Sequence, residues 1–369
     1  MKIFLQNSWL DKSIFLITIS LSIILLAPFF IVISSNVEIQ TDYLNFISGN
    51  ILQDYLYNSA FILISVILIC FFLGITSSYL VSFYEFTGVN FFKYSLLLSF
   101  AIPSYIYGYT LSAFFESYGV AYSIFSSISQ QSISPTIYKL GPITGSIISL
   151  SLTLFGYVFL LTRASFINQS RNMLEVGKSL GFSNFDNFYK IILPSARPAI
   201  FVGLSLVAME TLADFGTVSF FGISTFTTGI YNSWFIFDDL QAANFLSLFL
   251  LIFILIFFIF ESFSRKKVKF HNVANNENKK KIKIKLSGFK NFTAFSFCFF
   301  LFGISFLFPL SMMLSWTVSF PNYFNLSQII QLNLNSLKLI VISTIIIIFL
   351  SLITNFGERI LKSNFLAFC

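Results

Sequence analysis

The sequence predicts an all-α protein that crosses a membrane several times. Of its residues, 56 % are hydrophobic and only 10 % are charged, whereas soluble proteins carry about 25 % charged residues. A helix needs about 20 largely apolar residues to cross a bilayer. Eight segments meet this requirement, at 13–35, 58–83, 92–115, 142–162, 199–221, 241–262, 292–316 and 336–355.

The positions of Lys and Arg orient these segments. If the N-terminus is cytoplasmic and the spans alternate, the inner segments hold all of the 22 basic residues except Lys139 and Lys338. Such enrichment is typical of cytoplasmic loops. The net charge of +7 therefore follows from topology and requires no nucleic acid partner. The first span is too long for the apolar part of a signal peptide, so we expect a retained anchor.

A basic, polar stretch at 263–290 divides the chain. We interpret it as a cytoplasmic linker close to anionic lipids, with a specific lipid headgroup site as the alternative. The six spans before it form a first unit over 1–262. Because the Asn-Ser-led apolar segment at 58–72 is echoed at 335–349, we interpret 291–369 as an incomplete second copy with two spans.

The inner segment 163–198 has the pattern of an organised loop. A short helix is expected from Ser170 to Leu180, with Gly181 as its left-handed terminator. Ser183 and Asp186 form a capping-box pattern for a second helix, which Pro194 is expected to end before the next span begins.

Both expected helices carry apolar side chains. A water-exposed loop has no reason to present such a face unless a partner covers it, and the other interpretation is that the face folds back onto the membrane helices. The residues concerned are Leu174, Val176, Leu180, Phe185, Phe188, Ile191 and Ile192.

The tripeptide Gly177-Lys178-Ser179 matches the end of a phosphate-binding loop, G-x-x-x-x-G-K-[ST]. The position of the first glycine is occupied by Asn172, however, and no buried strand precedes it. We therefore do not interpret this stretch as a nucleotide site.

The spacing in this loop resembles a known signature. Glu175, Val176 and Gly177 are followed after three residues by Gly181, and after nine more by a closing Ile-x-Leu-Pro, at Ile191, Leu193 and Pro194. This pattern resembles the EAA signature of ABC-importer permeases, with the two alanines replaced by small residues. The flanking sequence from 179 to 235 and the stretch 101–109 are similar to the iron(III)-type branch, whose members usually fuse two permease copies.

The resemblance implies the type I ABC-importer transmembrane fold, in a bacterial inner membrane. It implies a permease rather than an enzyme, importing Fe(III), with ATP hydrolysis on a separate ATPase present in two copies. A periplasmic or lipoprotein substrate-binding protein is the other implied partner. Thiamine, a polyamine or a phosphonate is the alternative cargo. Four further helices and a second EAA loop are expected in a complete two-copy permease.

The resemblance also assigns roles to the motif residues. They would couple the permease to its ATPase as part of a docking helix, with the two glycines permitting close backbone approach. The coupling residues are Glu175, Gly177, Gly181, Ile191, Leu193 and Pro194.

Two carboxylates, Glu210 and Asp214, fall within the fifth expected span. Residues four apart share a helix face, and charges at membrane depth usually face a cavity or a partner. Our two interpretations are a translocation path attractive to a cation and a structural hydrogen bond to a neighbouring helix.

Other classes find little support. His271 is the only histidine and the three cysteines lack C-x-x-C spacing, so neither a metal site nor another cofactor is expected. The sequence has no arrangement typical of nucleophilic catalysis that would favour a membrane enzyme. A secondary transporter is disfavoured because the organised cytoplasmic loop indicates a protein partner.

Overall fold

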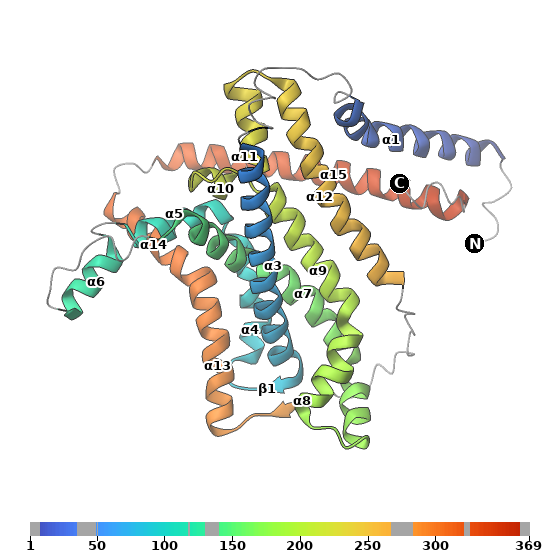
Figure 1. Cartoon of the computed structure of the whole chain (residues 1–369). Coiled ribbons are helices and arrows are strands. Elements are labelled where there is room, and N and C mark those ends of the chain that lie inside the picture. The colour runs from blue at the N-terminus through green and yellow to red at the C-terminus, as the bar shows by residue number, and fades with distance from the viewer. Residues whose placement is uncertain are drawn as a thin grey trace. The chain divides into compact units, whose positions relative to one another are not determined.

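The computed structural model describes residues 8–34, 49, 51–116, 119–129, 140–266, 283–320 and 325–361. Six of the described helices are long and apolar enough to cross a membrane, and a sharply bent pair makes a seventh span if counted as one. A shorter apolar helix covers Leu240–Ile256. The predicted all-α membrane fold is confirmed (Figure 1).

Three long helices form the core of the first unit. Helix α3 (Leu52–Phe83) packs along α7 (Pro142–Ser179), and α9 (Leu193–Ala213) packs against both. Gly74 of α3 meets α7 where a Cβ would lie 2.6 Å from the Cβ of Val158. Gly203 of α9 reaches the same residue, with its Cβ position 3.0 Å from the Val158 Cα. Small residues at these crossings let the three backbones approach closely.

The third expected span is not one straight helix. Helix α4 (Val89–Ser95) continues into the 3₁₀ helix η2 (Leu96–Ala101), and α5 (Ser104–Phe114) then leaves at 89°. Ile102 is extended and Pro103 precedes α5. Because a residue before proline disfavours the helical conformation, the bend lies where the sequence places this proline. A short helix, α6 (Val120–Ser129), follows.

The fifth expected span also differs from expectation. Helix α8 (Asn184–Asn187), the π-helix η4 (Phe188–Ile192) and α9 follow one another without a gap. The prediction that Pro194 ends a helix is wrong, because the chain continues past this proline into α9. The proline follows directly on the π-helix η4, whose i to i−5 bonding replaces the regular α-helical pattern at this point. At its other end the span breaks at Asp214, before α10 (Gly216–Phe220).

After α10 the chain forms α11 (Phe226–Tyr231), the π-helix η5 (Asn232–Ile236) and α12 (Leu240–Lys266). Residues 267–282, most of the expected linker, lie outside the described residues. The chain resumes with strand β2 (Ile284–Lys285), which pairs in parallel with β1 (Tyr84–Glu85).

The last described elements are α13 (Gly288–Phe302), the π-helix η6 (Gly303–Leu307), α14 (Phe308–Ser319) and α15 (Leu326–Leu361). Internal contacts divide the chain into Gln40–Ser315 and a unit of Met1–Ile39 with Trp316–Cys369, in which α1 (Ser8–Ser34) packs on α15. Helix α13 belongs to the first of these units, where it packs against α4 and η2. The boundaries of the two permease copies stay a prediction.

Candidate functional site: the turn after α7 and the carboxylates of α9

The motif segment begins inside a long helix. A separate helix beginning at Ser170 was expected, but α7 continues without a break to Ser179. The apolar residues of the fourth span are followed directly by residues that favour a helix. Helix α7 therefore continues through Ser170 and needs no new N-cap at this position. Glu175 lies within this extension, and its side chain lies outside the described residues. Gly177-Lys178-Ser179 thus ends a helix, whereas a phosphate-binding loop opens one.

Gly181 ends this helix as predicted. Its φ of +73° is left-handed, a conformation that glycine adopts without steric cost. The amide of Phe182 donates to the carbonyl of Gly177 at 2.9 Å, which is the six-to-one bond of a Schellman motif. The two glycines of the motif therefore belong to one turn.

Gly177 has a second role that the sequence did not reveal. It is buried, and a Cβ at this position would overlap the carboxamide of Asn187, which is itself only 2 % exposed. The backbone of α7 and the side chain from α8 thus share a space that admits no side chain at position 177. Asn187 lies ten residues further along, and its pairing with Gly177 depends on the turn between them.

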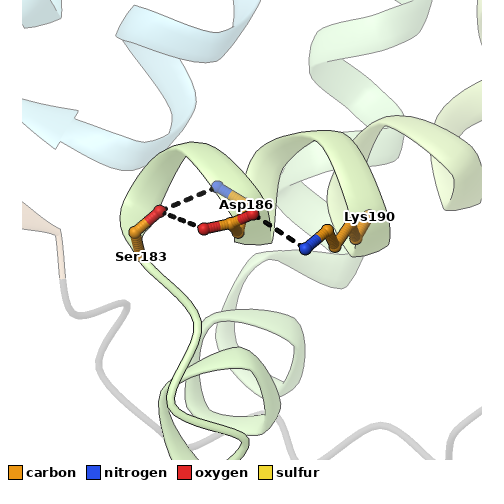
Figure 2. Close-up of polar contacts among 3 residues, drawn as sticks. All are labelled: Ser183, Asp186 and Lys190. Atoms are coloured by element: carbon orange, nitrogen blue, oxygen red, sulfur yellow. Dashed lines mark hydrogen bonds and ion pairs between the residues drawn. The ribbon is translucent and has the colours of Figure 1, made fainter.

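A polar cap begins the segment that follows the turn, residues 183–194, which we call the arm (Figure 2). The Ser183 hydroxyl accepts the amide N–H of Asp186 at 3.1 Å and donates to its carboxylate at 2.6 Å. Asp186 also pairs with Lys190, at 2.8 Å. The predicted cap is present in its backbone half, whereas the carboxylate bonds the serine hydroxyl, not the backbone N–H that a full capping box uses.

The apolar residues of this arm divide into two groups, so each of the two interpretations holds for part of the face. Ile192 is 2 % exposed, and Phe188 and Leu193 pack against the core of the first unit. Ile191 and Pro194 are half-buried. These residues fold back onto the membrane helices.

Phe185 and Tyr189 have the opposite environment. They are 72 % and 56 % exposed, and their rings lie 4.9 Å apart between centroids. We call them the aromatic pair. Two large exposed rings on a segment whose other apolar residues are packed in the core are typical of a protein-binding site. The spacing of the motif alone did not single out Tyr189.

The two carboxylates lie in different surroundings, although they are four residues apart. Helix α9 ends at Ala213, and Asp214 is extended, with ψ of 124°. Its carboxylate accepts four hydrogen bonds, from the hydroxyls of Ser104 and Thr217 and from the amides of Thr217 and Val218, at 2.9–3.1 Å. The backbone N–H groups at the beginning of α10 need such an acceptor. The Asp214 carboxylate, at the break between α9 and α10, provides it.

The hydrogen bonds of Asp214 favour the structural interpretation for this residue. The bond from Ser104 ties α5 to the break between α9 and α10. The cavity beside Asp214 has about 10 Å³ of space, which is at the lower limit for one water molecule.

Glu210, by contrast, is exposed on α9. The Tyr157 hydroxyl donates to the Glu210 carboxylate at 3.5 Å, a long hydrogen bond. Among the residues that the structure describes, no group of three or more His, Cys, Asp or Glu could hold a metal ion. The Glu210 carboxylate is thus less enclosed by the fold than the Asp214 carboxylate.

Known proteins resemble the chain in sequence. It is 26 % identical to the Fe(3+)-transport system permease protein FbpB 2 of Haemophilus influenzae, over 84 % of this chain and 56 % of that protein. It is also 26 % identical to the sulfate transport system permease protein CysT of Salmonella typhimurium, over 40 % of this chain and 50 % of that protein. The chain thus spans about half the length of the curated relatives it matches.

A solved structure shares the fold. A chain from the crystal structure of a bacterial ABC transporter involved in the import of the acidic polysaccharide alginate aligns with a TM-score of 0.55 and 17 % identity, over 71 % of this chain and 96 % of that one. The expected ABC-importer transmembrane fold is thereby confirmed. The family of binding-protein-dependent transport system inner membrane components matches residues 83–270, which include α9 and the turn before it. The chain is therefore a multi-pass inner membrane protein and belongs to this family of binding-protein-dependent transport system inner membrane components.

Proposed function

We propose that the chain is the permease part of an ATP-driven importer and that the aromatic pair docks a separate ATPase, present in two copies. The observation that carries this proposal is the contrast within one short arm. Ile192 and Leu193 anchor it in the core, while Phe185 and Tyr189 project from it. Movement of a docked partner would reach α9 directly, because α8, η4 and α9 are continuous.

The motif residues divide this task. Gly177 and Gly181 close the turn, while Ile191, Leu193 and Pro194 connect the arm to the membrane span. Glu175 offers a charge to the partner. A substrate-binding protein, periplasmic or lipid-anchored, delivers the cargo on the opposite side, and the N-terminus is cytoplasmic, as the distribution of basic residues indicates.

The proposed cargo is Fe(III). This is supported by the similarity to the iron-transport permease, which extends over 311 residues, whereas the similarity to a sulfate permease extends over 147. Glu210 would line the path of the cation, and Asp214 would shape the bend next to it. Sulfate is the second candidate, favoured by the CysT similarity.

Purification of the tagged chain from its native membranes tests the docking assignment. The unmodified chain should retain an ATPase. Changing Phe185→Ser and Tyr189→Ser together should lower the bound ATPase at least about tenfold, because buried aromatic anchors dominate interface energies. Phe235→Ser is the matched control, since Phe235 is 62 % exposed and lies in η5, away from the arm and from the beginning of α13. Equal ATPase retention by the double variant and the control would contradict the docking assignment.

Uptake measurements test the cargo. Cells with and without the intact gene are compared for uptake of radioactive Fe(III) and of radioactive sulfate. Loss of iron uptake alone supports Fe(III) as the cargo. Loss of sulfate uptake alone would contradict Fe(III) and identify sulfate as the cargo.

A further inference from the structure

The end of the linker is docked on β1 and on the last turn of α3, in contrast to a freely solvated tether. Strand β2 pairs with β1 in the register Tyr84 to Ile284 and Glu85 to Lys285. Leu286 donates its amide to the Glu85 carbonyl at 3.0 Å. A two-residue strand pair alone is marginal in water, so further contacts must stabilise this arrangement.

Two side chains provide such contacts. The Lys283 ammonium donates to the Val81 carbonyl at 2.6 Å, in the last turn of α3, where carbonyls lack helical partners and a cation is favoured. Asn291 of α13 accepts the Thr87 amide at 2.9 Å and donates to the Thr87 hydroxyl at 3.0 Å. We call residues 283–287 together with Asn291 the clamp.

The clamp connects to the arm that carries the aromatic pair. Tyr84, in β1, shares a hydrogen bond with the hydroxyl of Tyr79 at 3.2 Å. The Tyr79 ring lies 4.4 Å from the ring of Phe188, between centroids. Phe188 begins η4 and lies in sequence between the two members of the aromatic pair. A continuous set of contacts thus runs from the linker end, through Tyr84 and Tyr79, to the arm.

A flexible tether would need none of these contacts. The Lys283 and Asn291 bonds instead hold the beginning of α13 to the side of the first unit that carries the aromatic pair. Tyr79 touches both the strand that receives the linker and the helix that continues into α9. It is therefore placed to transmit a displacement of the arm to α13.

We propose that the clamp and Tyr79 join the ATPase-docking arm and the beginning of α13 into one mechanical body, with Tyr79 as the positioning residue. This inference rests on the docking function proposed above. It assigns the linker end a role in coupling, because a displacement of the arm by the docked ATPase would move α9 and α13 together.

A disulfide across the strand pair tests whether the clamp stays closed. Glu85→Cys with Lys285→Cys is made in the full complex, in a Cys369→Ser background and with each single variant as control. The native Cys70 and Cys298 are buried. Mild oxidation should cross-link the pair both with and without ATP, and the oxidised complex should keep at least half of its ATP hydrolysis. Failure to cross-link, or a loss of hydrolysis that a reductant reverses, would overturn the proposal.

Removal of one hydroxyl tests the transmission. Tyr79→Phe and Tyr84→Phe each delete the shared hydrogen bond and keep the rings, with Tyr57→Phe, whose side chain is 63 % exposed on α3, as control. ATP hydrolysis is measured with and without an iron-loaded binding protein. Each variant should lower the stimulated-to-basal ratio about threefold or more, at unchanged bound ATPase, and the double variant should be no worse than either single.

The outcomes separate this inference from the docking function. An unchanged ratio, or additive losses in the double variant, would overturn the role of Tyr79 while leaving the docking function intact. If the unmodified chain retains no ATPase, the docking function fails, and the coupling role falls with it; the disulfide yield still reports whether the clamp exists.

Discussion

Replacement of Gly177 by alanine should loosen the turn that presents the aromatic pair. The added Cβ overlaps the carboxamide of the buried Asn187, so this side chain must leave its position to admit it. Overpacking of this kind costs about 1–3 kcal/mol. Alanine recovers about 0.5–1 kcal/mol in a helix relative to glycine. The expected net change is thus a loss in local stability of up to about 2.5 kcal/mol, and Gly177→Val should lose more.

Hydrogen exchange at the Phe182 amide measures this loss, because that amide bonds the Gly177 carbonyl. A loss of about 1.4 kcal/mol corresponds to a tenfold fall in protection. Asn187→Ala removes the obstacle, so Gly177→Ala should cost little in that background. Equal costs of Gly177→Ala with and without Asn187 would refute the steric argument, since independent sites are additive.

The remaining predictions concern the second glycine and the carboxylates. Gly181→Asn should be tolerated and Gly181→Val should release bound ATPase, because the left-handed φ and not a neighbouring atom limits this position; equal retention of ATPase by both variants would contradict this. Asp214→Asn should destabilise the folded protein by about 1–3 kcal/mol and lower its yield, because an amide can accept only part of the four hydrogen bonds of Asp214. An unchanged melting temperature would instead support a role of Asp214 in the translocation path. Glu210→Gln should keep the yield and lower uptake of Fe(III) per folded complex, and unchanged uptake would remove Glu210 from the path.

The helix ends near the motif show which features can be predicted from nearby residues in the sequence. Gly181 as terminator and Ser183 as cap were predictable, because both act on the backbone within a few residues. The end of α9 at Asp214 was not, since an apolar run gives no sign of a break. The acceptor that stabilises this break receives a bond from Ser104, more than a hundred residues earlier.

Sequence pattern likewise identified the apolar face of the arm but not its division. Ile192 and Phe185 have the same hydrophobic character, yet one packs into the core and the other faces outward. Helix phase changes at the π-helix η4, so simple periodicity could not assign each residue to a side.

The sequence by itself determined the fold class, the approximate spans, the family resemblance and the small residues at 177 and 181, because apolar length, breaks in polarity and motif spacing are properties of nearby residues. Only the tertiary structure decided that Asn187 fills the space beside Gly177, that Asp214 lies outside its helix, and that the linker end pairs with Tyr84 and Glu85. The reason is physical: these features depend on which segments meet once the chain turns back on itself, and contacts between distant residues leave no periodic trace in either partner.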